Sequence, residues 1–170
     1  MILHLIRHPK PLVAPGICYG RLDISAENFA AVAENLRANL QSGLPVWSSP
    51  LQRCRKLAEL LNPNVIVDER LMEMDFGAWE GRSWDDIPRP ELDAWAADVA
   101  GYAPPGGESP LALQQRALDF VAALKVPEAV IVTHAGVIRT LLAHWQGLQP
   151  ARWTELVFGY GSCTRVVLPR

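Results

Sequence analysis

The sequence has few cysteines, no excess of charge of either sign and no long apolar run. The three cysteines among 170 residues are Cys18, Cys54 and Cys163, too few and too uneven for a disulfide framework, so we expect a cytoplasmic protein. The 16 Lys and Arg against 18 Asp and Glu give a net charge of −2, which predicts no nucleic-acid partner. No apolar run approaches the roughly 18 residues of a membrane span, so we expect no membrane partner.

Several motifs of phosphate and acyl chemistry are also missing. Neither Cys18 nor Cys54 is followed by the arginine of a Cys-x5-Arg phosphatase loop. A Gly-x4-Gly-Lys-Ser/Thr loop is absent, which argues against P-loop nucleotide hydrolysis, and no Gly-x-Ser-x-Gly elbow occurs. His4 and His8 are four residues apart, but no acidic partner lies near them in the sequence. We therefore expect neither a metal site nor a cofactor.

What is present is the pattern of a globular α/β domain, with 49% hydrophobic and 20% charged residues. Short apolar runs alternate with segments of helical periodicity, an order that favours a layered fold with parallel strands. We predict one domain over residues 1–170, with three layers: a mostly parallel central sheet flanked by helices. The expected strands lie at 2–6, 45–47, 64–67, 129–133 and 162–168, and the expected helices at 29–40, 50–61, 110–124 and 136–146.

Local signals predict where three of these helices begin. Ser25 is a suitable N-cap for the helix at 29–40. Ser49 fits the N-cap of the next helix, with Pro50 at its first position and Gln52 completing a capping box. Ser109, followed by a proline, is expected to open the helix at 110–124.

The stretch from about 75 to 108 does not follow the strand–helix alternation. It holds several aromatic residues among prolines and acids, and it has helical character at 90–99. We interpret it as a small, irregular and partly helical cap. Its aromatic residues could stack on a flat ring of a ligand, although most tryptophans simply pack in a core or an interface.

Polar residues follow three of the predicted strands at the point where each strand ends. These are Arg7-His8, then Ser48-Ser49 leading into the helix with Arg53, then Thr133-His134-Ala135-Gly136 at another helix start. The carboxyl ends of parallel strands share one edge of a sheet, where ligands bind. Two arginines, two histidines and two helix N-termini at one edge predict an anion pocket, most simply for phosphate. His4 and His144 are interpreted as structural.

These motifs and their order resemble the histidine phosphatase (phosphoglycerate-mutase-like) superfamily over nearly the whole chain. The matching segments are Arg7-His8, Ser49-Pro50-Leu51-Gln52-Arg53, Glu73 within residues 71–81, Gly106-Gly107-Glu108-Ser109 and Thr133-His134-Ala135-Gly136. The chain departs from the family at Pro9, where glycine is usual, and in residues 11–16, which lack a phosphate-contacting asparagine.

The resemblance implies a mechanism and a set of site residues. His8 is expected to attack phosphorus and form a phosphohistidine, with its protonation disfavoured by nearby guanidinium charges. Glu73, for which Asp75 and Glu80 are competitors, is expected to protonate the leaving alcohol and then activate water. The expected phosphate-binding groups are Arg7, Arg53, His134, Ala135 and, in place of the missing asparagine, Arg21. His134 can become cationic and pair with the phosphoryl group.

The resemblance thus predicts a metal-independent phosphomonoesterase acting on a small phosphorylated substrate, as a monomer or a homodimer. The loop Gly16–Asp23 is most similar to the α-ribazole-5′-phosphate phosphatase branch, which acts in cobalamin biosynthesis. The alternatives are phosphoryl transfer of the phosphoglycerate mutase type, a phospho-ligand binding module with little turnover, and a metal-assisted phosphoesterase. The short chain lacks a long insertion that would seal the site from water, which favours hydrolysis over transfer.

Overall fold

The computed structural model describes residues 1–169, and its centre is a five-stranded sheet. The strands β1 to β5 have the order β3-β2-β4-β1-β5. β1, β2, β3 and β4 run parallel to one another, and β5 runs antiparallel to β1 at one edge. The predicted α/β class and mostly parallel sheet are confirmed. The bounds of the strands are Ile2–Arg7 (β1), Val46–Ser48 (β2), Ile66–Val67 (β3), Glu128–Thr133 (β4) and Cys163–Val167 (β5).

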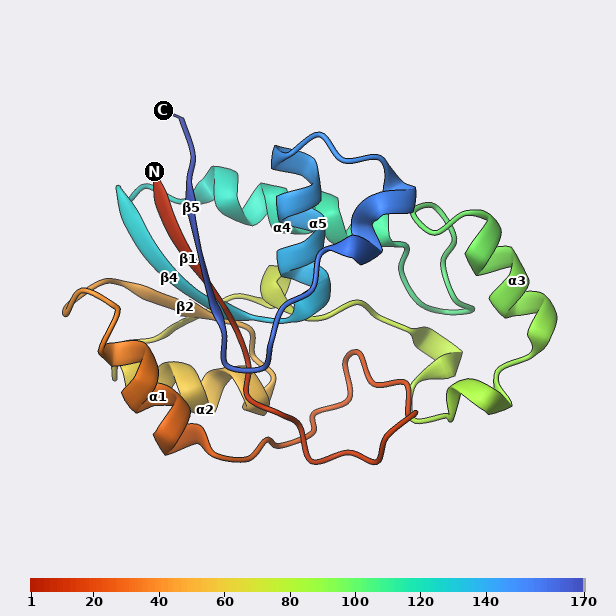
Figure 1. The fold of residues 1–170 in the computed structure, drawn as a ribbon, viewed down its shortest axis with the longest axis horizontal. Helices are drawn as coiled ribbons and strands as arrows, with labels where there is room; N and C mark the ends of the chain where they lie inside the picture. Colours follow the sequence, from red (N-terminus) through yellow and green to blue (C-terminus); the bar gives the residue numbers. More distant parts are fainter. Residues whose placement is uncertain (170) are drawn as a thin grey trace.

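Two pairs of helices cover the sheet on opposite faces (Figure 1). The helices α1 (Phe29–Arg37) and α2 (Gln52–Leu61) pack on one face, while α4 (Pro110–Ala123) and α5 (Ala135–Trp145) pack on the other. Successive side chains of a strand point to opposite faces. Along β4, residues Ala129 and Ile131 accordingly join the core under α4 and α5, while Val130 and Val132 join the core over α1 and α2. Burial on both faces explains why this strand is an uninterrupted apolar run.

Two of the three predicted N-caps are wrong, although α1 begins at Phe29 as expected. The N-cap of α1 is Asn28 rather than Ser25, and Asn28 adopts a left-handed conformation with φ 58°. At α2 the expected capping box does not form, because Asp23 from the first loop accepts the hydrogen bond of the Gln52 backbone N–H at 2.7 Å. The third start is confirmed, since the Ser109 hydroxyl accepts a hydrogen bond from the Ala112 N–H at 3.2 Å.

The segment between β3 and α4 begins with the 3-10 helix η1 (Glu69–Leu71), whose Leu71 joins the core under α4 and α5. It then leaves the sheet as the cap, with the 3-10 helices η2 (Gly77–Trp79) and η3 (Trp84–Asp86) followed by α3 (Arg89–Ala97). A further 3-10 helix, η4 (Pro150–Glu155), connects α5 to β5. The cap has its own aromatic core: Trp79 is fully buried and stacks on Tyr102, and the rings of Trp84 and Trp95 stack 5.7 Å apart.

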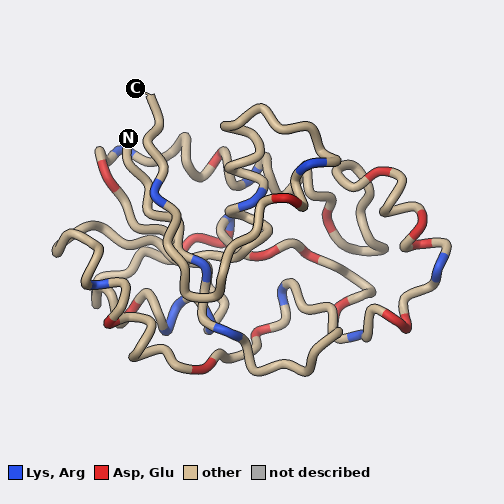
Figure 2. Tube along the Cα trace, viewed as in Figure 1, with Lys and Arg blue, Asp and Glu red and all other residues tan. Residues whose placement is uncertain are grey.

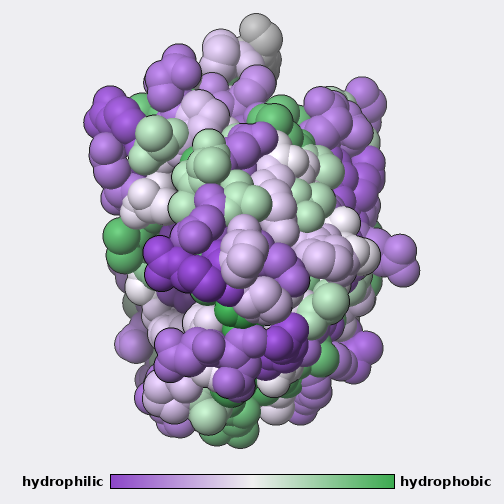
Figure 3. Space-filling model, turned by 90° about the vertical axis from the view of Figure 1, so that its right-hand side faces the viewer, coloured by the Kyte–Doolittle hydropathy of each residue, from purple (hydrophilic) through white to green (hydrophobic). Residues whose placement is uncertain are grey.

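Charge and hydropathy differ between parts of the surface. Several segments with Lys and Arg gather near the end of β1, from which the first loop departs. Acidic segments predominate along the cap (Figure 2). The face that carries the cap is mainly hydrophilic with scattered apolar patches (Figure 3). Within residues 1–169, none of the helices has both the length and the apolar character needed to span a bilayer.

Candidate active site

His8 follows the last residue of β1 and is almost completely buried, with 2% of its surface exposed. Its Nδ1 lies 2.6 Å from the carbonyl oxygen of Pro9. A carbonyl oxygen only accepts, so Nδ1 carries the proton and Nε2 is left with its lone pair. Burial, with smaller contributions from Arg53 and Arg7, lowers the pKa of His8 to about 3 against the opposing effect of the Pro9 hydrogen bond. His8 is therefore a neutral imidazole with a free Nε2 at neutral pH.

Two arginines lie close enough to His8 to affect its protonation. Arg7 donates from Nη1 to the carbonyl oxygen of Phe158 at 2.6 Å. Arg53, on the first turn of α2, is fully buried and donates to the carbonyl oxygens of Leu22 at 2.7 Å and Gly20 at 2.5 Å. Among the described residues, the Nε atoms of both arginines are buried without a hydrogen-bond acceptor. The site thus has two fixed positive charges, and the Nε–H group of each arginine can still donate a hydrogen bond to a ligand.

His134 comes directly before α5 and is fully buried, with its ring centroid 5.1 Å from that of His8. Its Nε2 lies 2.8 Å from the hydroxyl of Ser49 and 3.4 Å from the sulfur of Cys54. Burial, followed by the charge of Arg53, lowers the pKa of His134 well below its ordinary value. This shift favours a neutral His134 in the free protein at neutral pH. A cationic His134 paired with a phosphoryl group stays a prediction.

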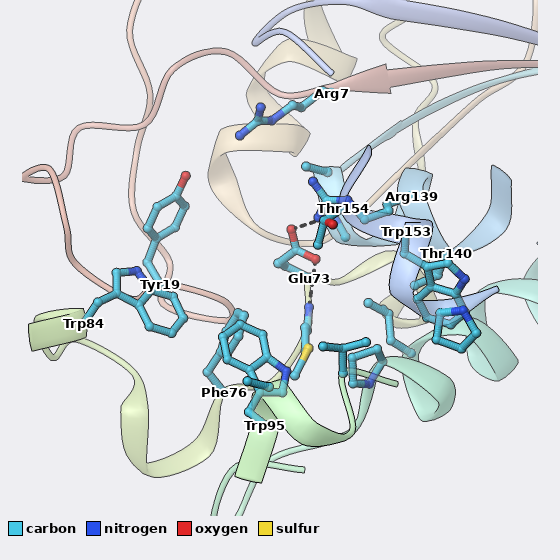
Figure 4. A pocket seen from close by; sticks show the side chains of 18 of the residues that line it. Arg7, Tyr19, Glu73, Phe76, Trp84, Trp95, Arg139, Thr140, Trp153 and Thr154 are labelled. Atoms are coloured by element: carbon cyan, nitrogen blue, oxygen red, sulfur yellow. Dashed lines mark hydrogen bonds between the residues drawn. The ribbon is translucent and has the colours of Figure 1, made fainter. Parts of the chain in front are cut away.

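Glu73 is held at the N-terminus of α5. Its Oε2 accepts a hydrogen bond from the Gly136 N–H at 3.1 Å, and its Oε1 accepts one from the Met74 N–H at 3.0 Å. A Cβ at position 136 would lie 2.1 Å from Oε1, so only glycine lets the carboxyl group approach the helix this closely. Figure 4 shows Glu73 between two walls of a cavity. Its competitors are engaged elsewhere: Asp75 accepts from Gly77 N–H, and Glu80 accepts from Gly20 N–H.

The motif reasoning did not identify Arg116, which fixes the segment that carries Glu73. From α4, Arg116 donates to the carbonyl oxygens of Arg70 and Met72, each at 2.7 Å, and to that of Glu73 at 3.0 Å. It also forms a two-pronged ion pair with Glu108. The motif Gly106-Gly107-Glu108-Ser109 indicates Glu108 as a residue of interest. Nothing in the sequence around Arg116 distinguishes it from an ordinary arginine of a surface helix.

Arg21 does not lie where a phosphate ligand is expected. Its guanidinium pairs with Asp75 at 3.4 Å and with Glu108 at 3.3 Å. These two carboxylates hold Arg21 against the cap. Arg21, Arg53 and His134 are not among the residues that line the cavity, but the ring of His134 lies 5.1 Å from that of His8 and the charge of Arg53 acts on His8. These ion pairs do not support our expectation that Arg21 replaces the missing asparagine, although its Nε, like those of Arg7 and Arg53, is buried without an acceptor among the described residues. Ala135, the first residue of α5, does line the cavity.

The cavity at His8 has a volume of about 500 Å³. One wall comes from the first loop and the cap, with Tyr19, Phe76, Trp84 and Trp95, and the opposite wall comes from α5 and η4 (Figure 4). Arg7, His8 and Glu73 line it as predicted, and Arg139 from α5 adds a positive charge that the sequence reasoning missed. Mostly apolar walls around a few charged groups are typical of a small-molecule site.

Comparisons with known proteins agree with this geometry. Residues 3–170 match the model of the histidine phosphatase superfamily (branch 1). The adenosylcobalamin/alpha-ribazole phosphatase of Escherichia coli is 30% identical over 152 residues, covering 82% of this chain and 69% of that protein. The glucosyl-3-phosphoglycerate phosphatase of Mycolicibacterium vanbaalenii is 32% identical over 165 residues, covering 86% of this chain and 71% of that protein.

Among solved structures, one described as a phosphoglycerate mutase from Thermus thermophilus superimposes with a TM-score of 0.81 at 35% identity. The match covers 100% of this chain and 95% of the other. The family match and the structural match extend over the strands and helices that place His8, Arg53, Glu73 and His134. The chain belongs to the histidine phosphatase superfamily, branch 1.

Proposed function

We propose that this protein is a metal-independent phosphomonoesterase that works through a phosphohistidine on His8. The observation that carries the proposal is the state of His8. Its Nδ1 is fixed by the Pro9 carbonyl, its Nε2 is unprotonated at neutral pH, and two arginine charges lie nearby. A neutral, oriented imidazole beside fixed positive charges is suited to attack a phosphate ester.

The reaction divides into two displacements at phosphorus. In the first, His8 Nε2 forms a bond to phosphorus while the P–O bond to the alcohol breaks, and Glu73 gives its proton to the departing oxygen. In the second, a water oxygen attacks phosphorus while the P–N bond breaks, and Glu73 takes a proton from that water. Orthophosphate leaves, and both residues return to their starting states.

The arginines and His134 stabilise the charge on the transferred group. Arg7 and Arg53 are held in place by carbonyl oxygens before any ligand binds, so little reorganisation is needed. His134 is neutral in the free protein, and a bound phosphoryl group favours its protonation because opposite charges attract at short range. The burial of His134 therefore couples proton uptake to substrate binding.

For the substrate, we propose a phosphate ester with a flat aromatic group, for which α-ribazole 5′-phosphate of cobalamin biosynthesis is the specific candidate. Trp84 and Trp95 in the cap, and Trp153 on the opposite wall, line the cavity that contains Glu73. Stacking on such side chains contributes about 1–3 kcal/mol per ring. The similarity to the Escherichia coli enzyme is in keeping with this candidate. We further propose a cytoplasmic location, and action as a monomer or a homodimer.

The test is phosphate release from 4-nitrophenyl phosphate and α-ribazole 5′-phosphate in excess EDTA, comparing wild type, His8→Ala and His4→Gln. His4 lies on β1, the strand that ends just before His8, and its Nε2 bonds to Glu128 at 2.7 Å, so it is a matched histidine control outside the cavity. We expect release from the wild type and His4→Gln, and loss of release in His8→Ala. Release that requires a metal, or persists in His8→Ala, would contradict the mechanism.

Three companion measurements separate the alternatives. Transfer of phosphate between the positions of phosphoglycerate without free phosphate would indicate a mutase. Binding of phosphate esters without turnover would indicate a binding module. A preference for the ribazole ester over phosphoserine and glycerol phosphate would support the substrate class.

A further inference from the structure

Two tyrosines from distant parts of the chain meet next to the arginines that flank His8. Tyr19 belongs to the first loop and Tyr160 to the loop before β5, and their hydroxyl oxygens lie 3.2 Å apart. The guanidinium carbon of Arg7 lies 3.8 Å from the ring centroid of Tyr160, and that of Arg53 lies 5.5 Å from the ring centroid of Tyr19. The ring of Tyr160 is also 5.8 Å from the ring of His8. Each tyrosine thus covers one of the two arginines.

The loop that carries Tyr160 is anchored to the catalytic dipeptide itself. The Gly161 N–H donates to the carbonyl oxygens of Arg7 and His8, each at 3.1 Å. The carbonyl oxygen of Phe158 accepts from the Arg7 guanidinium. Because both sides of Tyr160 are tied to the end of β1, its ring is held near His8 independently of Tyr19.

Tyr19 is held just as firmly by the residues on either side of it. Cys18 exchanges backbone hydrogen bonds with the cap, donating to Arg82 and accepting from Gly81, each at 2.8 Å. Gly20 donates to Glu80 at 2.9 Å and accepts from Arg53. A Cβ on Gly20 would lie 1.9 Å from the Met74 carbonyl oxygen, so the chain passes too close to the cap for a side chain there. Tyr19 lines the cavity from this fixed position.

One of the two hydroxyl hydrogens of Tyr19 and Tyr160 is not used in the hydrogen bond between them. Each phenol carries one O–H hydrogen, and one hydrogen suffices for the bond between the two oxygens. Burial, and then the hydrogen bond to Tyr160, raises the pKa of Tyr19, so its hydroxyl keeps its proton at neutral pH. One O–H in the pair is therefore free to donate to an acceptor, beside arginines whose charge attracts anions.

We propose that the Tyr19–Tyr160 pair donates a hydrogen bond to the phosphoryl oxygens bound at His8, in the role that the sequence suggested for Arg21. The proposal rests on the proposed function in that its ligand is the phosphoryl group transferred to His8. Arg21 is engaged by Asp75 and Glu108, whereas the rings of Tyr160 and Tyr19 lie against Arg7 and Arg53. Because both tyrosines are fixed before binding, the donor costs little to orient.

The test is the affinity for orthophosphate, measured by titration calorimetry on the whole protein. The variants are Tyr19→Phe, Tyr160→Phe, their combination, and Tyr102→Phe as a control. Tyr102 stacks on Trp79 in the cap, so it reports on the same chemical change away from the arginines. We expect the double variant to bind orthophosphate about tenfold or more weakly, with Tyr102→Phe unchanged, because a donor to a charged group is lost. The single variants then identify the donating hydroxyl.

The readouts distinguish a binding role from a structural one. The rings and their contacts with the arginines remain in the phenylalanine variants, so the thermal midpoint is expected to stay within a few degrees of wild type. If the protein turns over 4-nitrophenyl phosphate, its KM is expected to rise with the dissociation constant of orthophosphate. An unchanged orthophosphate affinity in the double variant, or no orthophosphate binding by the wild type, would overturn the proposal. Binding needs no turnover, so loss of the proposed hydrolysis alone would not affect this result.

Discussion

Gly136→Ala is expected to abolish most of the activity while leaving the fold intact. The added Cβ would lie 2.1 Å from Glu73 Oε1, whereas ordinary contact begins at 3.4 Å, so this oxygen must retreat by the difference, 1.3 Å. Oε1 is the end of a flexible side chain, so the carboxyl group moves and the backbone does not. A misplacement of about 1 Å can cost about 100-fold in rate, and general acid–base catalysis contributes about 10²–10⁴-fold. We therefore predict a loss of about 100-fold.

Stability is expected to change little in the same variant. Alanine is favoured over glycine within a helix by up to about 1 kcal/mol. The hydrogen bond from the Gly136 N–H to Glu73 contributes about 1 kcal/mol in the opposite direction. The two effects nearly cancel, so the thermal midpoint is expected to stay within about 4 °C of the wild type.

The assay compares kcat/KM for 4-nitrophenyl phosphate and for an alkyl phosphate, together with a thermal melt. An alkoxide needs a proton from Glu73 more than nitrophenolate does, so the loss is expected to be larger for the alkyl ester. Gly159→Ala is the matched control, since its Cβ would meet its nearest atom at 3.9 Å. Full activity in Gly136→Ala, or an equal loss for both esters, would refute the role assigned to Glu73.

Three further predictions concern the groups around the site. Arg116→Met is expected to lower the thermal midpoint, because breaking its largely buried ion pair with Glu108 costs about 3 kcal/mol. It is also expected to lower kcat, because the carbonyl oxygen of Glu73 loses the hydrogen bond that holds this segment. An unchanged thermal midpoint would contradict this. The pKa of His8 is about 3 in the folded protein and about 6.5 when unfolded, so the unfolded state binds more protons below pH 6.5 and stability falls as the pH falls. At pH 5 this loss from His8 is about 2 kcal/mol, and urea unfolding of His8→Asn is expected to show a correspondingly smaller decrease between pH 7.5 and 5. Trp84→Ala is expected to raise KM for an aromatic ester about 5-fold or more, with little change for glycerol phosphate; an equal change for both would argue against stacking.

The sequence was most informative where the physics is local. The apolar run at 129–133 predicted a buried strand, and Ser109 before Pro110 predicted the start of α4; the structure confirms both. The meeting of Arg7, His8, Arg53 and His134 followed from one topological assumption, that the strands are parallel.

What the sequence did not reveal depends on contacts between distant residues. Ser49 has the same local pattern as an N-cap, yet its hydroxyl pairs with His134, 85 residues away, while Asp23 caps α2. Arg21 was a reasonable phosphate ligand until its partners Asp75 and Glu108 were known. Arg116 reaches carbonyl oxygens more than 40 residues away, and no spacing rule encodes such a contact.

The most direct test of the central claim is to trap the covalent intermediate. The wild type and Glu73→Gln are mixed with 4-nitrophenyl phosphate, quenched in alkali within milliseconds to seconds, and analysed by peptide mass spectrometry. We predict an acid-labile, alkali-stable phosphoryl group on His8, which accumulates more in Glu73→Gln because water is no longer activated there. Phosphate release by the wild type without any phosphorylated His8, or a phosphoryl group on another residue, would contradict the account.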